Sequence, residues 1–265
     1  MRFSWLVLCL FLLGCNKKSD FTNIQIIGHA GMGLDMPNSM YHDNSKEAIE
    51  YALSINGCNG VEVDVQMSKD GQLWLYHDPT LETQTNATGC IYDKTSDELE
   101  QIKYSSFHFE KLAKLKQLNA DLLIGKTLYL DMRNFESCNN TILSTNLILN
   151  AVNQIEFLQN SAIEVVVISA DVNFLKQLHL AGYNVALEIS DPATFESYLA
   201  QFPEIKEVIF KSKSISKERL TTIKEMGINV TLFEMRSASG IRNALKKLPN
   251  SIITDDLRES IIEVY

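Results

Sequence analysis

The sequence predicts an α/β protein that folds as a (β/α)8 barrel, the TIM-barrel architecture, with a hairpin inserted after the second strand. Eight short runs of aliphatic and β-branched residues alternate with helical stretches, which favours a parallel sheet. No linker or change of composition divides the 265 residues. Polar residues collect toward the carboxyl ends of successive runs, the face where barrel enzymes carry their active sites. An open doubly wound sheet is the alternative, but no G-x-G-x-x-G motif follows the first run to support a dinucleotide-binding version.

The predicted strands are the segments richest in Val, Ile and Leu. They span residues 24–30, 60–67, 127–133, 164–170, 184–190, 207–212, 229–235 and 251–257. The predicted helices between them include residues 44–56, 171–182 and 216–227. The last two end at Gly182 and Gly227, and glycine readily adopts the left-handed conformation that terminates a helix.

A ninth strand, residues 72–78, follows the second strand after the turn Ser68-Lys69-Asp70-Gly71. So short a connection cannot carry the chain to a parallel neighbour, which requires a crossover of a dozen or more residues. The segment is therefore predicted to fold back as an antiparallel hairpin.

The first 20 residues are predicted to be a lipoprotein signal peptide and tether, and residues 21–265 the barrel domain. A short apolar run follows Arg2; it is too short to span a bilayer and is typical of a signal peptide. Residues 12–15, LLGC, resemble the bacterial lipobox. We therefore expect a lipid anchor at Cys15 and a location in the cell envelope, facing the periplasm or the surface. An ordinary cleaved signal with a coincidental cysteine is the alternative.

Charge and cysteine content exclude several classes of protein. The formal net charge is −9, and no block of Lys and Arg provides the basic face that nucleic-acid binding requires. After Cys15 the chain contains Cys58, Cys90 and Cys138, an odd set without the spacing of a zinc site. At most one pair can form a disulfide, and the spacing does not identify it.

The second strand carries acids between valines. Since side chains alternate across a strand, Val61, Val63 and Val65 share the face that packs on the helices. Glu62 and Asp64 share the inward face, roughly 7 Å apart along the strand. The third strand repeats this arrangement.

In the third strand, Leu128, Leu130 and Met132 face one way, and Asp131 and Arg133 face the other. A single buried acid is most often explained by a salt bridge, for instance Asp131 with Arg133. The three acids of the two strands together would repel one another and be costly to desolvate. A hard divalent cation, Mg²⁺ or Ca²⁺, removes that conflict, so we predict one such ion.

Two of the five histidines belong to this acidic cluster. His29 and His77 each end a β-rich run directed at it, and imidazoles titrate near neutral pH, so the pair can act as base and acid. His42, His108 and His179 are interpreted as structural or surface residues.

The segment 26–81 resembles the glycerophosphodiester phosphodiesterases. The family pattern is G-H-R-G, E-N-T, a G-x-E-x-D strand, T-K-D-G and H-D. The similarity continues more weakly in residues 127–133, like an E-x-K strand, and 251–257, like a terminal T-D-x-P. It implies the barrel with a hairpin insertion after strand two. It also implies that His29 and His77 are catalytic and that Glu62, Asp64 and Asp131 bind the metal.

Four of the chain's departures from the family pattern replace a charged residue of that pattern. Ala30 replaces the arginine that follows the first histidine, and Asp43 replaces the Glu of E-N-T. Asp131 replaces the Glu of E-x-K, a change that also occurs in the related sphingomyelinase D group. Arg133 replaces the lysine and can still bind a phosphate through two hydrogen bonds.

We therefore expect metal-dependent hydrolysis of glycerophosphodiesters to an alcohol and glycerol phosphate, with a small-molecule phosphodiester as substrate and no nucleic acid as partner. One alternative is a lyase-type phospholipase D acting on lipid headgroups. It would need an exposed apolar loop at the barrel mouth, and none stands out in the sequence. The other is a non-catalytic lipoprotein that binds a phosphorylated ligand, for which Ala30 is the main support.

Overall fold

The computed structural model describes residues 21–34, 36 and 39–265; the predicted signal peptide, tether and Cys15 lie outside them. Eight parallel strands pair in the order β1-β10-β9-β8-β7-β6-β5-β2, and pairing of β2 with β1 closes the barrel. These strands are β1 (Gln25–Gly28), β2 (Gly60–Met67), β5 (Thr127–Met132), β6 (Glu164–Ser169), β7 (Asn184–Ile189), β8 (Glu207–Lys211), β9 (Asn229–Phe233) and β10 (Ser251–Thr254). The predicted barrel is confirmed.

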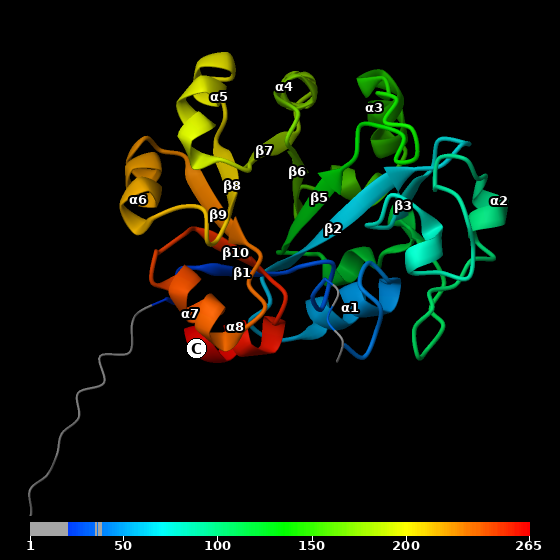
Figure 1. The fold of residues 1–265 in the computed structure, drawn as a ribbon, viewed down its shortest axis with the longest axis horizontal. Helices are drawn as coiled ribbons and strands as arrows, with labels where there is room; N and C mark the ends of the chain where they lie inside the picture. Colours follow the sequence, from blue (N-terminus) through cyan, green and yellow to red (C-terminus); the bar gives the residue numbers. More distant parts are fainter. Residues whose placement is uncertain (1–20, 35, 37–38) are drawn as a thin grey trace, which may run out of the picture.

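Helices lie outside the ring of strands (Figure 1). They are α1 (Lys46–Ser54), α3 (Thr145–Asn153), α4 (Val172–Leu180), α5 (Phe195–Gln201), α6 (Lys217–Glu225), α7 (Ala238–Leu245) and α8 (Leu257–Val264). Gly182 and Gly227, just beyond α4 and α6, have φ values of 93° and 79°, as predicted for helix-terminating glycines. Within the described segments, no helix is long and apolar enough to cross a membrane.

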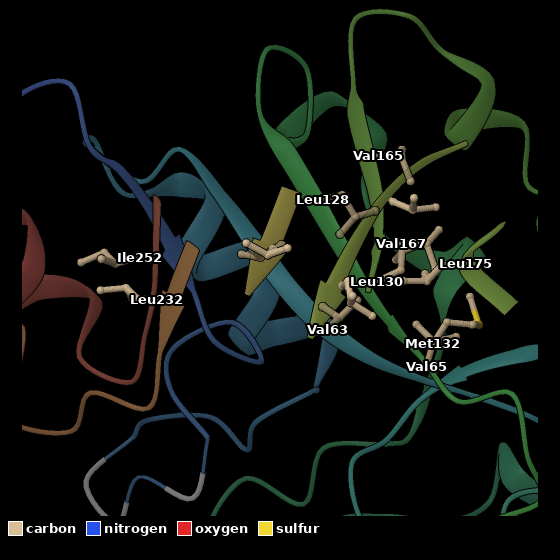
Figure 2. Close-up of a cluster of buried hydrophobic side chains, with 14 of the residues drawn as sticks. Val63, Val65, Leu128, Leu130, Met132, Val165, Val167, Leu175, Leu232 and Ile252 are labelled. Atoms are coloured by element: carbon tan, nitrogen blue, oxygen red, sulfur yellow. The ribbon is translucent and has the colours of Figure 1, made fainter. Parts of the chain in front are cut away.

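The two faces of each barrel strand bury different sets of side chains. The outward face packs against the helices, with Val63, Val65, Leu128, Leu130 and Met132 in one continuous apolar core (Figure 2). A separate inward cluster fills the barrel with Ile27, Tyr129, Val166, Ile168, Ala186, Ile209 and Ile253. The alternation predicted from the valine spacing is therefore confirmed, and it leaves Glu62 and Asp64 on the inward side.

The insertion after β2 begins with β3 (Leu73–Leu75), which pairs with β2 in the antiparallel direction, as predicted. It continues through α2 (Ser96–Leu99) and β4 (Ala113–Lys114), the latter antiparallel to β3. The insertion is larger than the predicted hairpin, and it has a hydrophobic core of its own. That core contains Trp74, Tyr76, Leu81, Ile91, Leu99, Ile102, Tyr104 and Leu112.

A disulfide between Cys90 and Cys138 joins the insertion to the loop that follows β5, with the two Cα atoms 5.9 Å apart. Cys58 is buried, and its Sγ donates a hydrogen bond to the Gly60 carbonyl at 3.1 Å. The structure thus identifies the one pair that the spacing of the cysteines left open. The disulfide fixes the insertion next to the carboxyl end of β5.

Candidate active site

Three carboxylates meet near the carboxyl ends of β2 and β5. The two strands are hydrogen-bonded in a register that sets Asp64 opposite Asp131. Oxygen atoms of Glu62, Asp64 and Asp131 all lie within 4.8 Å of one another. Glu62 and Asp64 are only 4% and 3% exposed, so water does little to screen their charges. The predicted acidic cluster is therefore assembled by adjacent strands of the barrel.

Such a cluster is unfavourable without a compensating charge. Burial and the charge of Asp64 raise the pKa of Glu62 well above its usual range, against an opposing effect of His29. Burial and the charges of Asp64 and Glu188 raise the pKa of Asp131 to about 7, although Arg133 opposes the shift. Three converging hard oxygen donors, two of them with raised pKa values, fit a divalent cation whose positive charge would favour their ionised forms.

His29 follows β1 and is held in place from two sides. Its backbone N–H donates to the Thr254 carbonyl at 3.0 Å. Its Nδ1 donates to Oδ1 of Asp255 at 2.7 Å, and its Nε2 lies 3.7 Å from Oε2 of Glu62. Burial opposes protonation, but the hydrogen bond to Asp255 and the charge of Glu62 outweigh it and raise the pKa of His29 to about 9. The imidazole therefore directs Nε2 toward the acidic cluster.

The tight turn after β1 depends on glycine at more than one position, Gly28 among them. A Cβ on Gly28 would lie 2.1 Å from the carbonyl oxygen of Gly31, so a larger residue would displace the turn. Within this turn, buried Ala30 adopts a φ of 48° and its N–H donates to Oε2 of Glu62 at 3.1 Å. Ala30 therefore orients a carboxylate through its backbone, although it lacks the guanidinium found at this position in the family pattern.

Asp255, just after β10, is a site residue that sequence reasoning did not single out. It is 1% exposed, and its Oδ1 also accepts the Leu34 N–H at 3.2 Å. Its buried Oδ2 accepts no hydrogen bond from the described part of the chain, and the Nε of Arg236 lies 3.7 Å away. The available signal was its position at the carboxyl end of a predicted strand, within the segment that resembles the family's terminal T-D-x-P.

Asn44 is a second residue that the sequence prediction missed. It is fully buried, with a φ of 54°, and asparagine tolerates this left-handed conformation better than most residues. Its Nδ2 donates to Oδ2 of Asp64 at 2.7 Å, and its Oδ1 accepts the Asp64 N–H at 3.0 Å. This pair of hydrogen bonds fixes both the backbone and the carboxylate of Asp64.

His77 lies after β3, near enough to Asp131 for its charge to lower the pKa of that acid, and its side chain is 34% exposed. Its Nδ1 bonds Oδ1 of Asp78 at 2.8 Å. Gln66, the next inward residue of β2 after Asp64, donates from Nε2 to the carbonyls of Tyr76 and Asp78 at 2.8 and 2.9 Å. The Nη2 of Arg133 donates to the carbonyl of His77. The segment that carries His77 is therefore tied to β2 and β5.

The remaining histidines occupy other environments. His42 stacks on Tyr104 with ring centroids 3.8 Å apart, and its N–H donates to Oε1 of Glu110 at 3.0 Å. The His179 ring packs edge-on against Phe202. Their structural interpretation agrees with these contacts.

A cavity of about 330 Å³ opens between the segment before α1 and the insertion. It is lined by Gly33, Met36, Ser39, Met40, Tyr41, His42, Asp43, Gln84, Ser105 and Ser106.

The fold and these side chains define a class of protein: a (β/α)8 barrel with an acidic, histidine-flanked site at the carboxyl ends of its strands. More specifically, the chain belongs to the glycerophosphoryl diester phosphodiesterase family, which residues 29–259 match. The family suggested by the segment 26–81 is confirmed.

Curated relatives match over shorter stretches. A glycerophosphodiester phosphodiesterase of Bacillus altitudinis is 39% identical over 71 residues, which are 27% of this chain and 29% of that protein. One of Caldanaerobacter subterraneus subsp. tengcongensis is 33% identical over 88 residues, 33% of this chain and 34% of that protein. The aligned stretch thus spans about a third of these relatives.

Solved structures share the fold over nearly the whole chain. A glycerophosphoryl diester phosphodiesterase structure from Agrobacterium tumefaciens has a TM-score of 0.77 at 16% identity, covering 90% of this chain and 96% of that one. An Oleispira antarctica phosphodiesterase in complex with the product sn-glycerol-3-phosphate has a TM-score of 0.73 at 18% identity, covering 91% and 96%. At these identities the likeness establishes the fold.

Proposed function

We propose that this chain hydrolyses glycerophosphodiesters to an alcohol and glycerol phosphate, with one divalent cation and a pair of histidines. The observation that carries the proposal is the convergence of Glu62, Asp64 and Asp131 beside His29 in a barrel of this family. The product named for the Oleispira antarctica structure, sn-glycerol-3-phosphate, is the product that such a reaction would release.

The cation would be held by the carboxylates of Glu62, Asp64 and Asp131, whose oxygen atoms suit Mg²⁺ and Ca²⁺ alike. When bound, it would polarise the phosphoryl oxygens and offset the charge that develops in the transition state. Asn44 and the Ala30 N–H contribute by fixing the orientation of two of these ligands before any ion arrives.

His29 is proposed as the base or nucleophile. Asp255 accepts the Nδ1–H, which leaves Nε2 as the nitrogen that can accept a proton or attack phosphorus. Because Asp255 is buried and fixed by the Leu34 N–H, it also holds the imidazole ring in a single orientation. A cation at the neighbouring carboxylates would counter the negative charge that raises the pKa of His29, and so favour the neutral, reactive imidazole.

His77 is proposed as the acid that protonates the leaving alcohol. Asp78 binds Nδ1, so Nε2 is the nitrogen available to the substrate. The greater exposure of His77 suits a group that must meet leaving alcohols of different size. The cavity of about 330 Å³, lined in part by Gly33 of the turn that follows His29, is proposed to receive that alcohol.

Arg133 is proposed to bind the phosphate. One of its nitrogens donates to the His77 carbonyl, so the guanidinium couples the phosphate site to the segment of the proposed acid. Arg236, 3.7 Å from Asp255, is a second guanidinium beside the site. It is a candidate to supply the positive charge that Ala30 does not.

The rival reading, a lipoprotein that binds a phosphorylated ligand without catalysis, explains less of the geometry. Each proposed catalytic imidazole is paired with its own carboxylate, His29 with Asp255 and His77 with Asp78. Pairs of this kind fix a tautomer, which matters for proton transfer and is not needed for binding alone.

Two substrates with different leaving groups test these assignments. His77→Ala should be severely impaired on a glycerophosphodiester but much less on a nitrophenyl diester, whose phenolate leaves without protonation. His29→Ala should be impaired on both, because attack on phosphorus is needed whatever departs. Each imidazole should supply about 10²- to 10⁴-fold in rate. Equal losses by both variants on both substrates would overturn the acid assignment, and near wild-type rates would remove either histidine from the mechanism.

Attachment to the cell envelope through an acylated Cys15 is also a proposal, supported by the LLGC sequence alone. Cys15→Ala should release the protein from the membrane fraction. Equal retention of the variant and the wild type would show that Cys15 is not the anchor.

A further inference from the structure

Residues 103–111, KYSSFHFEK, form a loop of the insertion that we call the docking loop. Phe107 and Phe109 in this loop are 90% and 64% exposed. Single exposed apolar side chains are ordinary on protein surfaces, but two large aromatic rings in three residues are not. The sequence analysis found no exposed apolar loop, because the residues alone do not show which aromatic rings remain outside the core.

The exposed tip is an ordered turn. Tyr104 N–H donates to the Glu110 carbonyl at 2.8 Å, and the isolated bridge between Lys103 and Lys111 closes the stem. Phe109 adopts a φ of 53°, a left-handed conformation that is costly for an aromatic residue. The ring of Phe109 remains 64% exposed, so its packing does little to offset the cost of this conformation.

The charges of the docking loop favour an anionic surface. Lys103 and Lys111, at the two ends of the loop, are exposed. Its single acid, Glu110, is 5% exposed and is turned inward to accept the N–H of His42. The loop therefore presents two aromatic rings at its tip with two ammonium groups at its base, although the whole chain has a net charge of −9.

The docking loop lies beside the cavity proposed to receive the leaving alcohol. Tyr104 stacks on His42, and His108 packs near Tyr41 with ring centroids 5.5 Å apart. Ser105 and Ser106 line the cavity proposed for the leaving alcohol. In Figure 1 this part of the insertion lies on the same side of the molecule as α1 and α2.

We propose that the docking loop inserts Phe107 and Phe109 into the interface of an anionic lipid bilayer, with Lys103 and Lys111 on the headgroups. Aromatic rings favour the interface between headgroups and acyl chains, and lysines near a membrane surface are attracted by anionic lipids. The docking itself is argued from exposure and charge. Its consequence, that the site acts on diesters at a membrane surface, rests on the proposed function.

Fluorescence quenching tests the docking without any assay of hydrolysis. Phe107→Trp in the full chain places an indole at the tip, and the matched control Leu180→Trp places one at the end of α4, where Leu180 is 86% exposed. Vesicles of phosphatidylcholine and phosphatidylglycerol with brominated acyl chains quench only indoles that enter the bilayer. The signal of the wild-type chain, which includes buried Trp74, is subtracted.

We expect the indole at position 107 to be quenched strongly and that at position 180 weakly, even if a lipid anchor holds both variants at the vesicle. Adding Lys103→Gln and Lys111→Gln should weaken docking about fivefold per lysine on anionic vesicles. Equal quenching at the two positions would overturn the proposal. It would also be overturned if lipid did not quench the indole at position 107 and a protein partner covered it instead. Unchanged docking after loss of both lysines would refute the anionic surface.

Discussion

At the residue scale, the contact between His29 and Asp255 decides which imidazole nitrogen faces the acidic cluster. The two atoms are 2.7 Å apart, and Asp255 is 1% exposed. A hydrogen bond to a buried carboxylate fixes both the tautomer and the orientation of a histidine. Asp255 is therefore a positioning residue whose effect on the reaction is exerted through His29.

We predict that Asp255→Asn lowers kcat on a glycerophosphodiester by about 10²-fold or more, because the amide can donate to Nδ1 and favour the wrong tautomer. KM should change less, because Asp255 is buried and acts through His29. Asp256→Asn is the matched control, because Asp256 accepts the Glu259 N–H at the start of α8 and has no contact with His29. The prediction fails if the two variants lose the same activity, or if Asp255→Asn changes only KM.

A second prediction concerns Glu207, at the opposite end of the barrel strands. Its carboxylate accepts hydrogen bonds from the Tyr129 hydroxyl at 2.8 Å and the Thr231 hydroxyl at 2.7 Å. Burial nevertheless raises the pKa of Glu207 above its usual 4.5. The folded protein thus binds this proton more tightly than the unfolded chain does. Between pH 4.5 and the raised pKa, this group makes the fold less stable as the pH rises.

Glu207→Gln retains an oxygen that can accept both hydrogen bonds and cannot ionise. The variant should match the wild type in Tm below pH 4.5 and exceed it increasingly at higher pH, until the wild-type residue is fully ionised. Thermal unfolding across this pH range measures the difference. A difference in Tm that is independent of pH, or a variant less stable at neutral pH, would contradict the account.

At the scale of elements, the insertion carries His77 and is tied to the barrel strands that hold the acidic cluster. Gln66 on β2 and Arg133 after β5 both donate to carbonyls of the segment that carries His77. The disulfide from Cys90 to Cys138 ties the same two regions covalently. The position of His77 therefore depends on how the insertion is docked to the barrel.

We predict that Cys90→Ser with Cys138→Ser lowers the free energy of unfolding by about 2–4 kcal/mol, the usual contribution of a native disulfide. The bond closes a loop across a sequence separation of 48, long enough for a substantial restriction of the unfolded chain. The activity of this double variant should fall further on a glycerophosphodiester, which needs His77 as acid, than on a nitrophenyl diester. Cys58→Ser, at a buried thiol outside the disulfide, is the control. If denaturant unfolding shows no greater loss of stability in the double variant than in Cys58→Ser, the disulfide does not stabilise the fold.

The same elements show how far the sequence could predict the fold. Barrel strands were predictable because the period-two alternation in β2 and β5 is local, and it also predicted that Glu62, Asp64 and Asp131 converge. The core of the insertion was not predictable, since β4 has two residues and α2 four, too short for a pattern. Asp255 and Asn44 were missed because their partners lie 226 and 20 residues away, and spacing carries no information about such contacts.

At the scale of the whole molecule, closure of the barrel brings together residues from both ends of the described chain. Pairing of β1 with β10 and with β2 places His29 between Asp255 and Glu62. A cation bound by the carboxylates of Glu62, Asp64 and Asp131 would link strands β2 and β5 and stabilise the folded state. At a concentration one hundred times its Kd, it would add about 2.7 kcal/mol to the free energy of unfolding.

The central claim, a cation-dependent phosphodiesterase site on Glu62, Asp64 and Asp131, is tested most directly by the rate of glycerophosphodiester hydrolysis before and after exhaustive chelation. A panel of diesters is used, with Mg²⁺ and Ca²⁺ added back separately. Glu62→Gln is compared with Asp121→Asn, which changes an exposed acid outside the cluster. We predict that chelation abolishes hydrolysis, that one or both ions restore it, and that Glu62→Gln alone requires far more ion. Full activity after chelation, or equal behaviour of the two variants, would contradict the claim.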